Sequence, residues 1–485
     1  MISNFIGGEW VRSQSNGTTE VTNPATGEVL DHCPVGSADD VAQAVAAAKS
    51  AFKTWRQTPA IDRTQCFFRL KNLMEENAEH LALMITKENG KTLVEARGSV
   101  RRAIQMVETA CGIPSLMMGD AFEDIASGID CVAVRRPMGV FAAVTPFNFP
   151  AMVAFWFWPF AVACGNTFVL KPSERVPLTQ MEIFKLIEKA GFPKGVINMV
   201  HGGKDVVNAL CDHTDVQGVS FVGSTPVAKH VYTRATQTGK RVQALGGAKN
   251  FMVVLPDAVM DKAVSTALES IIGCAGERCL AGSVVLCVGQ ETYADVTERM
   301  IRLTKEVMVG DGAAKTTGMG PLISQASKDR VKDLIASAER EGARILVDGR
   351  TGVDQLKGYF LKPTLVVDVK RHMRVAKEEI FGPVVCLAKV ESLDEAIEWL
   401  NSSNYANTTT LFTTNGAAAR KFSYEVEPSM IGINIGVPAP MAFFSFGGAK
   451  DSFYGDIKAH GQASVDFYTD KKVTVQKWLK DSSIW

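Results

Sequence analysis

The chain has 485 residues, of which 46% are hydrophobic and 21% charged, with 52 basic and 52 acidic side chains. The apolar content excludes a disordered chain, the length allows about three folded units, and the zero net charge argues against nucleic-acid or membrane-surface binding. The ten cysteines form no CxxC pair and indicate reduced thiols. Because the first residues also lack the pattern of a secretory signal, we expect a cytoplasmic protein.

Residues 120–137 are expected to form an exposed β-hairpin. A matching segment lies late in the chain, where residues 463–477 alternate polar and apolar side chains like a strand at a solvent edge. Exposed strands of this kind commonly pair with another chain. We therefore expect these two segments to assemble a homo-oligomer, either a dimer or a tetramer.

No charged side chain lies between Arg136 and Lys171. By its number of residues alone, this uncharged stretch would be long enough to span a bilayer. However, Pro146, Pro150 and Pro159 interrupt it, and a lone helix could not satisfy so many broken backbone positions in lipid. The stretch is therefore interpreted as a buried strand, a loop and a buried helix inside a large core.

Short apolar runs alternate with helical patterns between residues 140 and 250. The runs predict strands over 139–144, 167–170, 196–200 and 218–222. Between the second and third strands, Thr179 and Glu182 have the spacing of a capping box and predict the start of a helix. Continuous apolar strands separated by helices are typical of a doubly wound parallel sheet, which places the protein in the α/β class.

A second α/β unit follows Asn250. It is expected to contain strands over 251–255 and 284–288, a helix from about Met260, and a long amphipathic helix that ends near Met308. A further helix is expected to begin at Ser392, which forms a second capping box with Glu395. The two units together predict two sheets of mainly parallel strands.

The segment 273–281, with the sequence GCAGERCLA, contains two cysteines. Cys274 is interpreted as a small buried hydrophobic residue, the common role of a cysteine in a core. Cys279 differs because small residues precede it and Arg278 is its neighbour. A nearby cation lowers the pKa of a thiol and favours the nucleophilic thiolate. Cys279 is therefore a candidate nucleophile.

Other motifs follow the strands. Residues 145–150 (TPFNFP), 170–174 (LKPSE) and 221–224 (FVGS) come at the carboxyl ends of predicted parallel strands, the edge at which open α/β sheets bind ligands. Residues 378–383 (EEIFGP) and 446–450 (FGGAK) complete the set. In this order and spacing, over essentially the whole chain, the motifs resemble those of the NAD(P)-dependent aldehyde dehydrogenase superfamily.

The resemblance implies a role for each matched residue. Cys279 matches the nucleophile that attacks the aldehyde, and Asn148 matches the donor that stabilises the resulting oxyanion. NAD is the implied cofactor, with NAD preferred over NADP because Glu174 would hold the adenosine ribose hydroxyls. The residues that match the NAD-binding positions are Thr145, Pro146, Phe147, Lys171, Ser173, Glu174, Gly223, Ser224, Glu379 and Phe381.

The resemblance also implies a three-part organisation. An NAD-binding domain is expected over residues 1–118 and 138–247, and a second α/β catalytic domain over 248–445. A small β oligomerisation element is expected to combine residues 119–137 and 446–485. The doubly wound parallel sheet would then belong to the NAD-binding domain.

One departure from the resemblance is specific. Most aldehyde dehydrogenases have a glutamate just before Leu-Gly-Gly, and it activates the water that hydrolyses the thioester. Motif matching puts Ala244 at that place, whereas counting back from Cys279 puts Leu245 there, and neither can act as a base. Together with GAKN at 247–250 and GERC at 276–279, this absence resembles the CoA-acylating methylmalonate-semialdehyde dehydrogenases. Coenzyme A is therefore expected as co-substrate, because a thiolate attacks without a strong base.

Substrates of that branch, malonate and methylmalonate semialdehyde, carry a carboxylate. Arg278 and Arg102 are the candidate residues to bind it, since a guanidinium suits bidentate carboxylate binding. Arg101 is expected on a solvated helix face, and residues 436–444 are expected to form a wall of the substrate site. The resemblance predicts acetyl-CoA or propionyl-CoA as products, with loss of carbon dioxide.

Two alternatives stay open at this stage. The first is a hydrolytic aldehyde dehydrogenase that forms a free acid, against which the non-acidic position 244–245 counts. The second is a non-catalytic structural or binding protein that retains the fold, against which Cys279 and Asn148 count. The seven histidines show no metal-binding spacing, so no metal site is expected.

Overall fold

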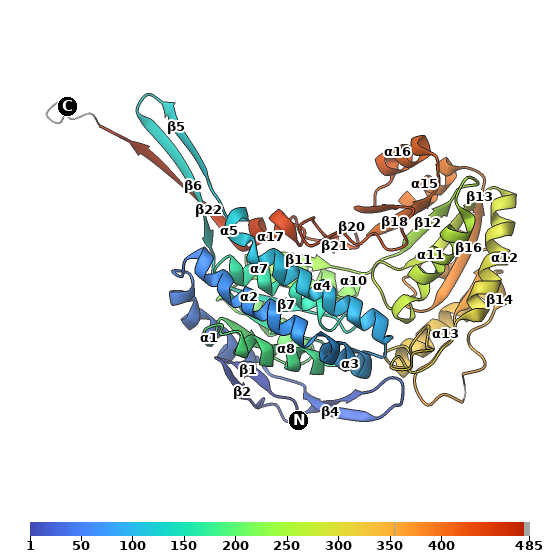
Figure 1. Cartoon of the computed structure of the whole chain (residues 1–485), viewed down its shortest axis with the longest axis horizontal. Coiled ribbons are helices and arrows are strands. Elements are labelled where there is room, and N and C mark those ends of the chain that lie inside the picture. Colours follow the sequence, from blue (N-terminus) through green and yellow to red (C-terminus); the bar gives the residue numbers. More distant parts are fainter. Residues whose placement is uncertain (354, 480–485) are drawn as a thin grey trace.

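The computed structural model describes residues 1–353 and 355–479. It contains two large sheets packed against helices and a small three-stranded sheet that projects from the body (Figure 1). Two short antiparallel pairs complete the strands, namely β3 (Thr18–Thr22) with β4 (Val29–Pro34) and β17 (Tyr405–Ala406) with β20 (Ala449–Lys450). The predicted α/β class with parallel sheets is confirmed.

The first sheet has eight strands in the order β2-β1-β9-β8-β7-β10-β11-β21. Its five central strands are parallel, and the antiparallel strands lie at its edges. The predicted strands of the first unit are all confirmed within it. The members are β1 (Asn4–Ile6), β2 (Glu9–Val11), β7 (Val140–Val144), β8 (Thr167–Lys171), β9 (Ile197–Met199), β10 (Val216–Val222), β11 (Arg241–Leu245) and β21 (Phe453–Tyr454).

Side chains of the first sheet alternate between two apolar clusters, one on each face. Along β7, Val140 and Ala142 belong to one cluster, and Phe141 and Ala143 to the other. The helices of the first cluster are α1 (Ala38–Trp55), α9 (Lys204–Asp212) and α10 (Thr225–Thr236). Those of the second are α2 (Ala60–Glu76), α3 (Ala78–Asn89), α4 (Leu93–Cys111), α5 (Ile113–Leu116), α6 (Met152–Phe155), α7 (Trp158–Ala163), α8 (Leu178–Lys189) and α17 (Gly461–Tyr468).

The uncharged stretch before Lys171 folds as expected into buried elements of this first unit, namely β7, the short helices α6 and α7, and β8. Its side chains supply much of the apolar cluster on the α2–α8 face. Among the described residues, no helix is long and apolar enough to cross a membrane.

The second sheet has seven strands in the order β14-β15-β16-β13-β12-β18-β19, and only β14 is antiparallel. Its strands are β12 (Asn250–Val254), β13 (Gly282–Val288), β14 (Arg344–Val347), β15 (Thr364–Val367), β16 (Val384–Val390), β18 (Thr408–Phe412) and β19 (Met430–Ile433). Its helices are α11 (Met260–Ile272), α12 (Gln290–Glu306), α13 (Gln325–Arg340), α14 (Arg374–Lys377), α15 (Leu393–Asn401) and α16 (Gly416–Glu425). As predicted, the hydroxyl of Ser392 accepts a hydrogen bond from the backbone of Glu395 and starts α15.

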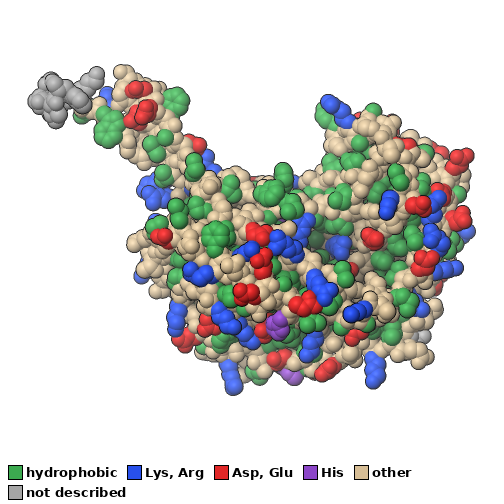
Figure 2. All heavy atoms as spheres, viewed as in Figure 1, with side chains coloured by type: hydrophobic (Ala, Val, Ile, Leu, Met, Phe, Trp, Pro, Cys, Tyr) green, Lys and Arg blue, Asp and Glu red, His purple; other side chains and the backbone are tan. Residues whose placement is uncertain are grey.

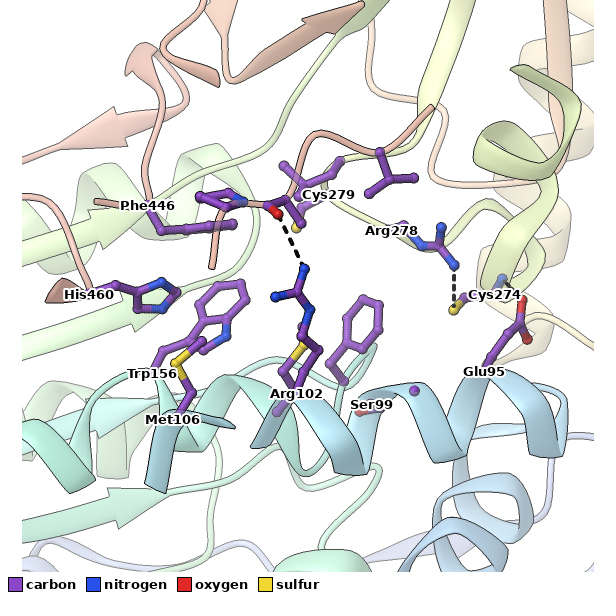
Figure 3. Close-up of a pocket in the computed structure, with 17 residues that line it drawn as sticks. Glu95, Ser99, Arg102, Met106, Trp156, Cys274, Arg278, Cys279, Phe446 and His460 are labelled. Atoms are coloured by element: carbon purple, nitrogen blue, oxygen red, sulfur yellow. Dashed lines mark hydrogen bonds between the residues drawn. The ribbon is translucent and has the colours of Figure 1, made fainter. Parts of the chain in front are cut away.

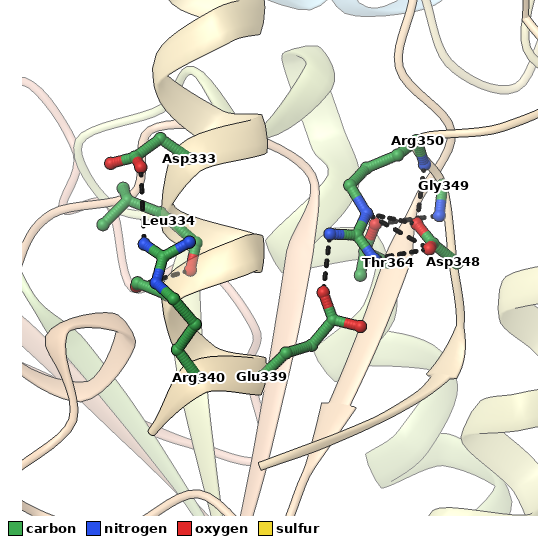
Figure 4. Close-up of polar contacts among 9 residues, drawn as sticks. Asp333, Leu334, Glu339, Arg340, Asp348, Gly349, Arg350 and Thr364 are labelled. Carbon is green, nitrogen blue, oxygen red and sulfur yellow. Dashed lines mark hydrogen bonds and ion pairs between the residues drawn. The ribbon is translucent and has the colours of Figure 1, made fainter. Parts of the chain in front are cut away.

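An ionic cluster fastens α13 to the edge of the second sheet (Figure 4). The guanidinium of Arg350 lies 2.7 Å from the carboxylates of both Glu339 and Asp348. The hydroxyl of Thr364, the first residue of β15, accepts a hydrogen bond from the backbone of Gly349. These contacts hold the segment after β14 against α13 and β15.

The third sheet has the order β22-β6-β5, with β5 (Asp120–Ala126), β6 (Ile129–Pro137) and β22 (Thr469–Lys477). The predicted hairpin at 120–137 is confirmed. The prediction of one strand over 463–477 is wrong for its first part, because residues 463–468 belong to α17. That helix buries Val465 and Phe467 in the apolar cluster of the α2–α8 face, which overrides the alternating pattern. Residues 480–485, part of the expected oligomerisation element, lie outside the described residues.

The predicted capping box at Thr179 is also wrong. Helix α8 already begins at Leu178, so Thr179 is inside it and its side chain caps nothing. The buried carboxylate of Glu88 caps the helix instead, accepting hydrogen bonds from the backbone N–H groups of Leu178 (2.7 Å) and Thr179 (2.9 Å). Burial raises the pKa of Glu88 to about 7. A cap from a residue ninety positions away leaves no local signal.

Candidate active site

Cys279 lies in a turn that connects a helix to a central strand of the second sheet. Helix α11 ends at Ile272, a short 3-10 turn occupies Gly273–Gly276, and β13 begins at Gly282. Cys279 is partly exposed, whereas Cys274 is buried. The turn therefore presents one of its two cysteines to the space between the two sheets.

The backbone of this turn adopts an uncommon conformation. Cys274 and Ala275 have φ angles of 53° and 54°, in the left-handed region that residues with a Cβ rarely occupy. The backbone N–H of Cys274 donates a hydrogen bond to the Glu95 carboxylate on α4, at 2.6 Å. A contact from a distant helix thus helps to hold the turn that leads to the nucleophile.

Two asparagines fix the backbone of Cys279 itself. The side-chain amides of Asn250 and Asn407 each donate a hydrogen bond to the Cys279 carbonyl, at 2.9 Å. The sequence indicated neither role. Asn250 closes the GAKN motif, which was a usable signal, whereas Asn407 is the single residue between β17 and β18 and belongs to no motif. With its carbonyl held twice, Cys279 has little freedom to move its thiol.

The expectation that Arg278 gives Cys279 a low pKa is wrong in its net direction. The pKa of Cys279 is raised to about 12, first by removal from water and then by the charge of Glu379, and Arg278 opposes these two effects only in part. The guanidinium of Arg278 turns toward Cys274, with 3.5 Å between Nη2 and Sγ. Arg278 therefore does not give the Cys279 thiol a lowered pKa.

Cys279 lines two cavities of about 350 Å³ each. We call them the arginine cavity, which contains Arg102 and Arg278 (Figure 3), and the glycine cavity, which contains Gly223, Gly246 and Gly247. The thiol thus lies where a molecule in either cavity can reach it. Among the described residues, no group of three or more His, Cys, Asp or Glu side chains is placed to hold a metal ion.

Asn148 lies beside the nucleophile turn. Its side-chain amide donates a hydrogen bond to the backbone carbonyl of Glu277, two residues before Cys279, at 3.0 Å. The backbone carbonyl of Asn148 accepts a hydrogen bond from the buried ammonium of Lys91, at 2.5 Å. Asn148 also lines the glycine cavity together with Cys279. The structure therefore brings the two expected catalytic residues together, and Lys91 is a positioning residue that the sequence did not indicate.

The expected cofactor-binding residues divide into two groups. Pro146, Phe147, Gly223, Ser224, Glu379 and Phe381 line the glycine cavity with Cys279. Thr145, Lys171, Ser173 and Glu174 lie outside both cavities, at the carboxyl ends of β7 and β8 in the same sheet. The Lys171 ammonium and the Glu174 carboxylate form an ion pair of 2.8 Å. The expected residues that follow β7, β8 and β10 therefore lie along one edge of the first sheet. Glu379 and Phe381 face this edge across the glycine cavity.

Glu379 forms the wall of the glycine cavity opposite the first sheet. Its carboxylate accepts a hydrogen bond from the backbone N–H of Ala248 at 3.0 Å, and burial raises its pKa to about 7. Arg330, which sequence analysis missed, also lines this cavity and donates to the Glu379 carbonyl at 3.0 Å. Phe381 packs edge-on against Phe147, with ring centroids 5.9 Å apart. These contacts join the two sheets across the cavity.

Arg102 points from α4 into the arginine cavity (Figure 3). Its guanidinium donates to the carbonyl of Ala439 at 3.2 Å, in the loop expected to form a substrate wall. Val437, Ala439 and Pro440 of that loop line the cavity. Arg101 instead forms exposed ion pairs with acidic residues, as expected for a solvated helix face.

The comparisons with known proteins agree with this geometry. Residues 10–474 match the model of the aldehyde dehydrogenase family. The chain belongs to this family. This aldehyde dehydrogenase is 50% identical to the malonate-semialdehyde dehydrogenase of Halalkalibacterium halodurans, over 98% of each chain. It is 48% identical to malonate-semialdehyde dehydrogenase 2 of Geobacillus kaustophilus, over 98% of this chain and 99% of the relative.

Two solved structures are similar to this chain over nearly its whole length. The methylmalonate-semialdehyde dehydrogenase of Oceanimonas doudoroffii superimposes with a TM-score of 0.98 at 42% identity, covering 100% of this chain and 99% of that one. A Sinorhizobium meliloti protein assigned to methylmalonate-semialdehyde dehydrogenase and solved with NAD gives a TM-score of 0.98 at 38% identity, with 99% of each chain covered.

In this aldehyde dehydrogenase, Leu245 rather than Ala244 lies on the face of the first sheet against which Cys279 packs. Side chains of a strand alternate between its faces, and β11 ends at Leu245. Leu245 belongs to the apolar cluster against which Cys279 packs, whereas Ala244 belongs to the cluster on the other face of the sheet. The sheet face therefore favours Leu245 over Ala244 as the position nearer Cys279. Both side chains are apolar, so neither can act as a base.

Proposed function

We propose that this aldehyde dehydrogenase oxidises malonate semialdehyde or methylmalonate semialdehyde with NAD and coenzyme A, giving acetyl-CoA or propionyl-CoA, carbon dioxide and NADH. The observation that carries the proposal is the position of Cys279. It lines both a cavity that contains two arginines and a cavity lined by the matched cofactor residues. The names of the relatives support the same reading.

The residues present fit a bound dinucleotide. Gly223 and Ser224 lie at the start of α10, a helix of 12 residues whose N–H groups are suited to a pyrophosphate. Lys171 and Glu174 offer a donor and an acceptor for ribose hydroxyls, and Glu379 offers a second acceptor. When bound, NAD accepts a hydride from the substrate. The chain's own part is to hold the substrate carbon on Cys279 within reach of that cavity.

The reaction follows from the site residues. The Cys279 thiol releases its proton to solvent as its sulfur adds to the aldehyde carbon, and the amide of Asn148 donates to the oxygen as it gains negative charge. Oxidation leaves a thioester on Cys279 whose acyl group carries a β-carboxylate. That carboxylate leaves as carbon dioxide, and the carbon it vacates takes up a proton. The thiol of coenzyme A then takes the acyl group and frees Cys279.

Product identification tests the proposal directly. The enzyme would be incubated with NAD, coenzyme A and each semialdehyde, and the products identified by mass spectrometry. We expect one acyl-CoA for each NADH, as acetyl-CoA from malonate semialdehyde and propionyl-CoA from methylmalonate semialdehyde. Formation of the free acid instead of the acyl-CoA would contradict the proposal and would show that the protein is a hydrolytic aldehyde dehydrogenase.

We expect Glu174→Gln to narrow the preference for NAD over NADP by about tenfold. The Glu174 carboxylate, at the position matched to the ribose hydroxyls, would repel a 2′-phosphate, and the amide removes that negative charge without changing the shape. Steady-state kcat/KM values with both cofactors measure the ratio. Equal efficiency of the wild-type enzyme with NAD and NADP would contradict this role.

We expect Arg102→Leu to lower kcat/KM for malonate semialdehyde by about 30-fold or more, and that for propanal far less. The reason is that a desolvated carboxylate would lose its charged partner. Arg101→Leu is the matched control, because this neighbouring arginine only pairs with Glu75 and Glu108 at the surface. If Arg102→Leu impairs both aldehydes equally, the arginine is structural.

We also propose that the chain forms a homo-oligomer through the projecting sheet. Hydrophobic side chains lie on the surface of this projecting sheet, next to a hollow in the surface of the molecule (Figure 2). On β22, Val473 and Val475 are 58% and 63% exposed.

We also propose that the chain is divided into three parts. These are an NAD-binding domain (1–118 and 138–247), a catalytic domain (248–445) and an oligomerisation element (119–137 and 446–485). A reducing compartment such as the cytoplasm suits the ten cysteines, all of which are free thiols.

A further inference from the structure

Helix α4 forms one wall of the arginine cavity (Figure 3). Most of its residues that line the cavity are three or four positions apart and so share one face of the helix, and they are Glu95, Gly98, Ser99, Arg102 and Met106. Gly98 is the one among them without a side chain. It comes three residues after Glu95 and four before Arg102, which is about one helical turn from each.

Close packing does not account for the glycine at position 98. Gly98 lies inside α4, where glycine destabilises a helix relative to alanine, and its φ is not positive. A Cβ added at Gly98 would meet no heavy atom within 4 Å. By contrast, a Cβ at Gly436, in the loop that leads to the facing wall, would lie 2.7 Å from the Thr266 carbonyl. The missing side chain of Gly98 therefore leaves open space on the face of α4 that lines the cavity.

This open space lies between the two groups that would hold the ends of the substrate. In the proposed reaction, the aldehyde carbon joins Cys279, which lines the same cavity, and the carboxylate binds Arg102. Glu95 accepts a hydrogen bond from the backbone of Cys274, in the turn that leads to the nucleophile. Because Gly98 comes between Glu95 and Arg102 on one face of α4, the carbon that joins the aldehyde to the carboxylate is expected to lie beside it. This carbon carries only hydrogens in malonate semialdehyde, but it carries a methyl group in methylmalonate semialdehyde.

We propose that Gly98 is a specificity-determining residue, which leaves room for a substituent on the carbon between the aldehyde and the carboxylate. The inference rests on the proposed function. Much of the cavity lining is apolar and includes Met106, Phe149, Met152 and Trp156, so the cavity suits a hydrocarbon substituent. A side chain at position 98 would compete with that substituent for the same space.

The test compares kcat/KM for methylmalonate semialdehyde and for malonate semialdehyde in the wild-type enzyme, Gly98→Ala and Gly98→Val. The ratio of the two efficiencies is the readout, because the substrates differ only in the methyl group. We expect alanine to lower the methylmalonate-to-malonate ratio by about 10-fold and valine to lower it further, since one methyl group in a hydrophobic pocket is typically worth about 10-fold or more. Both variants should fold, because alanine and valine favour a helix more than glycine does. A melting temperature no lower than that of the wild-type enzyme checks this.

Gly416→Ala and Gly416→Val are the matched controls. Gly416, the first residue of α16, is like Gly98 an exposed glycine at which a Cβ would meet no heavy atom within 4 Å. It lines neither cavity, so its substitution should leave the ratio at the wild-type value. A ratio in Gly98→Val equal to that of the wild-type enzyme, or an equal loss of both efficiencies, would overturn the role of Gly98.

Failure of the proposed function has a different signature in the same experiment. If the wild-type enzyme converts neither semialdehyde to an acyl-CoA, the proposed function falls, and the role of Gly98 falls with it. If the wild-type enzyme forms acetyl-CoA from malonate semialdehyde but does not oxidise methylmalonate semialdehyde, the space beside Gly98 does not admit the methyl group. In that case only the role of Gly98 falls.

Discussion

Cys279→Ala is expected to lower aldehyde oxidation by about 10⁴-fold or more, because the thiol makes the covalent intermediate and no neighbouring group can replace it. Cys274 is buried, and its sulfur lies against Arg278 and Lys91. NAD binding should persist, since the expected contacts of the dinucleotide lie on other segments. NADH formation followed by absorbance, together with a direct NAD-binding measurement, checks both parts.

Cys111→Ala is the matched control for loss of a thiol. Cys111 ends α4, is only partly buried, and lies outside both cavities. Its substitution should leave turnover close to that of the wild-type enzyme. Substantial NADH production by Cys279→Ala would show that another residue is the nucleophile and would remove the basis of the proposed mechanism.

Without coenzyme A, the wild-type enzyme is expected to form about one NADH per active site in a fast burst and then to turn over slowly. Water attack on the thioester lacks a general base, a contribution typically worth about 10²–10⁴-fold. Addition of coenzyme A should raise the steady rate until it saturates. Stopped-flow absorbance resolves the two phases, and rapid, linear NADH formation without coenzyme A would contradict the proposed acyl transfer.

Leu245→Glu is expected to restore part of the hydrolysis, since β11 directs this side chain to the face on which Cys279 packs. Leu245→Gln is the matched control, because the amide has the same shape but is not a base. Release of free acid by the glutamate variant and not by the glutamine variant supports the assignment. Equal behaviour of the two variants would mean that position 245 does not reach the thioester.

The sequence predicted most of the fold because its strands are continuous apolar runs bounded by turn residues. It also predicted the meeting of distant motifs, since the carboxyl ends of parallel strands share one edge of a sheet. Asn148 and Gly223 lie far apart in the chain, yet both line the glycine cavity with Cys279 for this reason. Strand order and edge geometry therefore account for much of the site.

What the sequence did not predict depends on tertiary contacts. Glu88 caps α8, and Asn250 and Asn407 donate hydrogen bonds to the Cys279 carbonyl. The guanidinium of Arg278 is directed toward the sulfur of Cys274. Arg278 and Cys274 are four residues apart, but the other pairs are distant in the sequence and have no characteristic spacing. The burial that raises the pKa of Cys279 likewise depends on neighbours from several elements, so a cation adjacent in sequence was a poor guide.

Helix α4 contacts two separate parts of the candidate active site. Glu95 holds the backbone that leads to the nucleophile, and Arg102, seven residues later, reaches the wall loop at Ala439. Seven residues are about two turns, or roughly 10 Å of helix axis, so both side chains lie on one face. If Arg102 binds the substrate carboxylate as proposed, α4 fixes the separation between that guanidinium and the turn that leads to the thiol. The helix would then limit the length of the semialdehyde that fits, and a substrate with one more methylene group is expected to react more slowly.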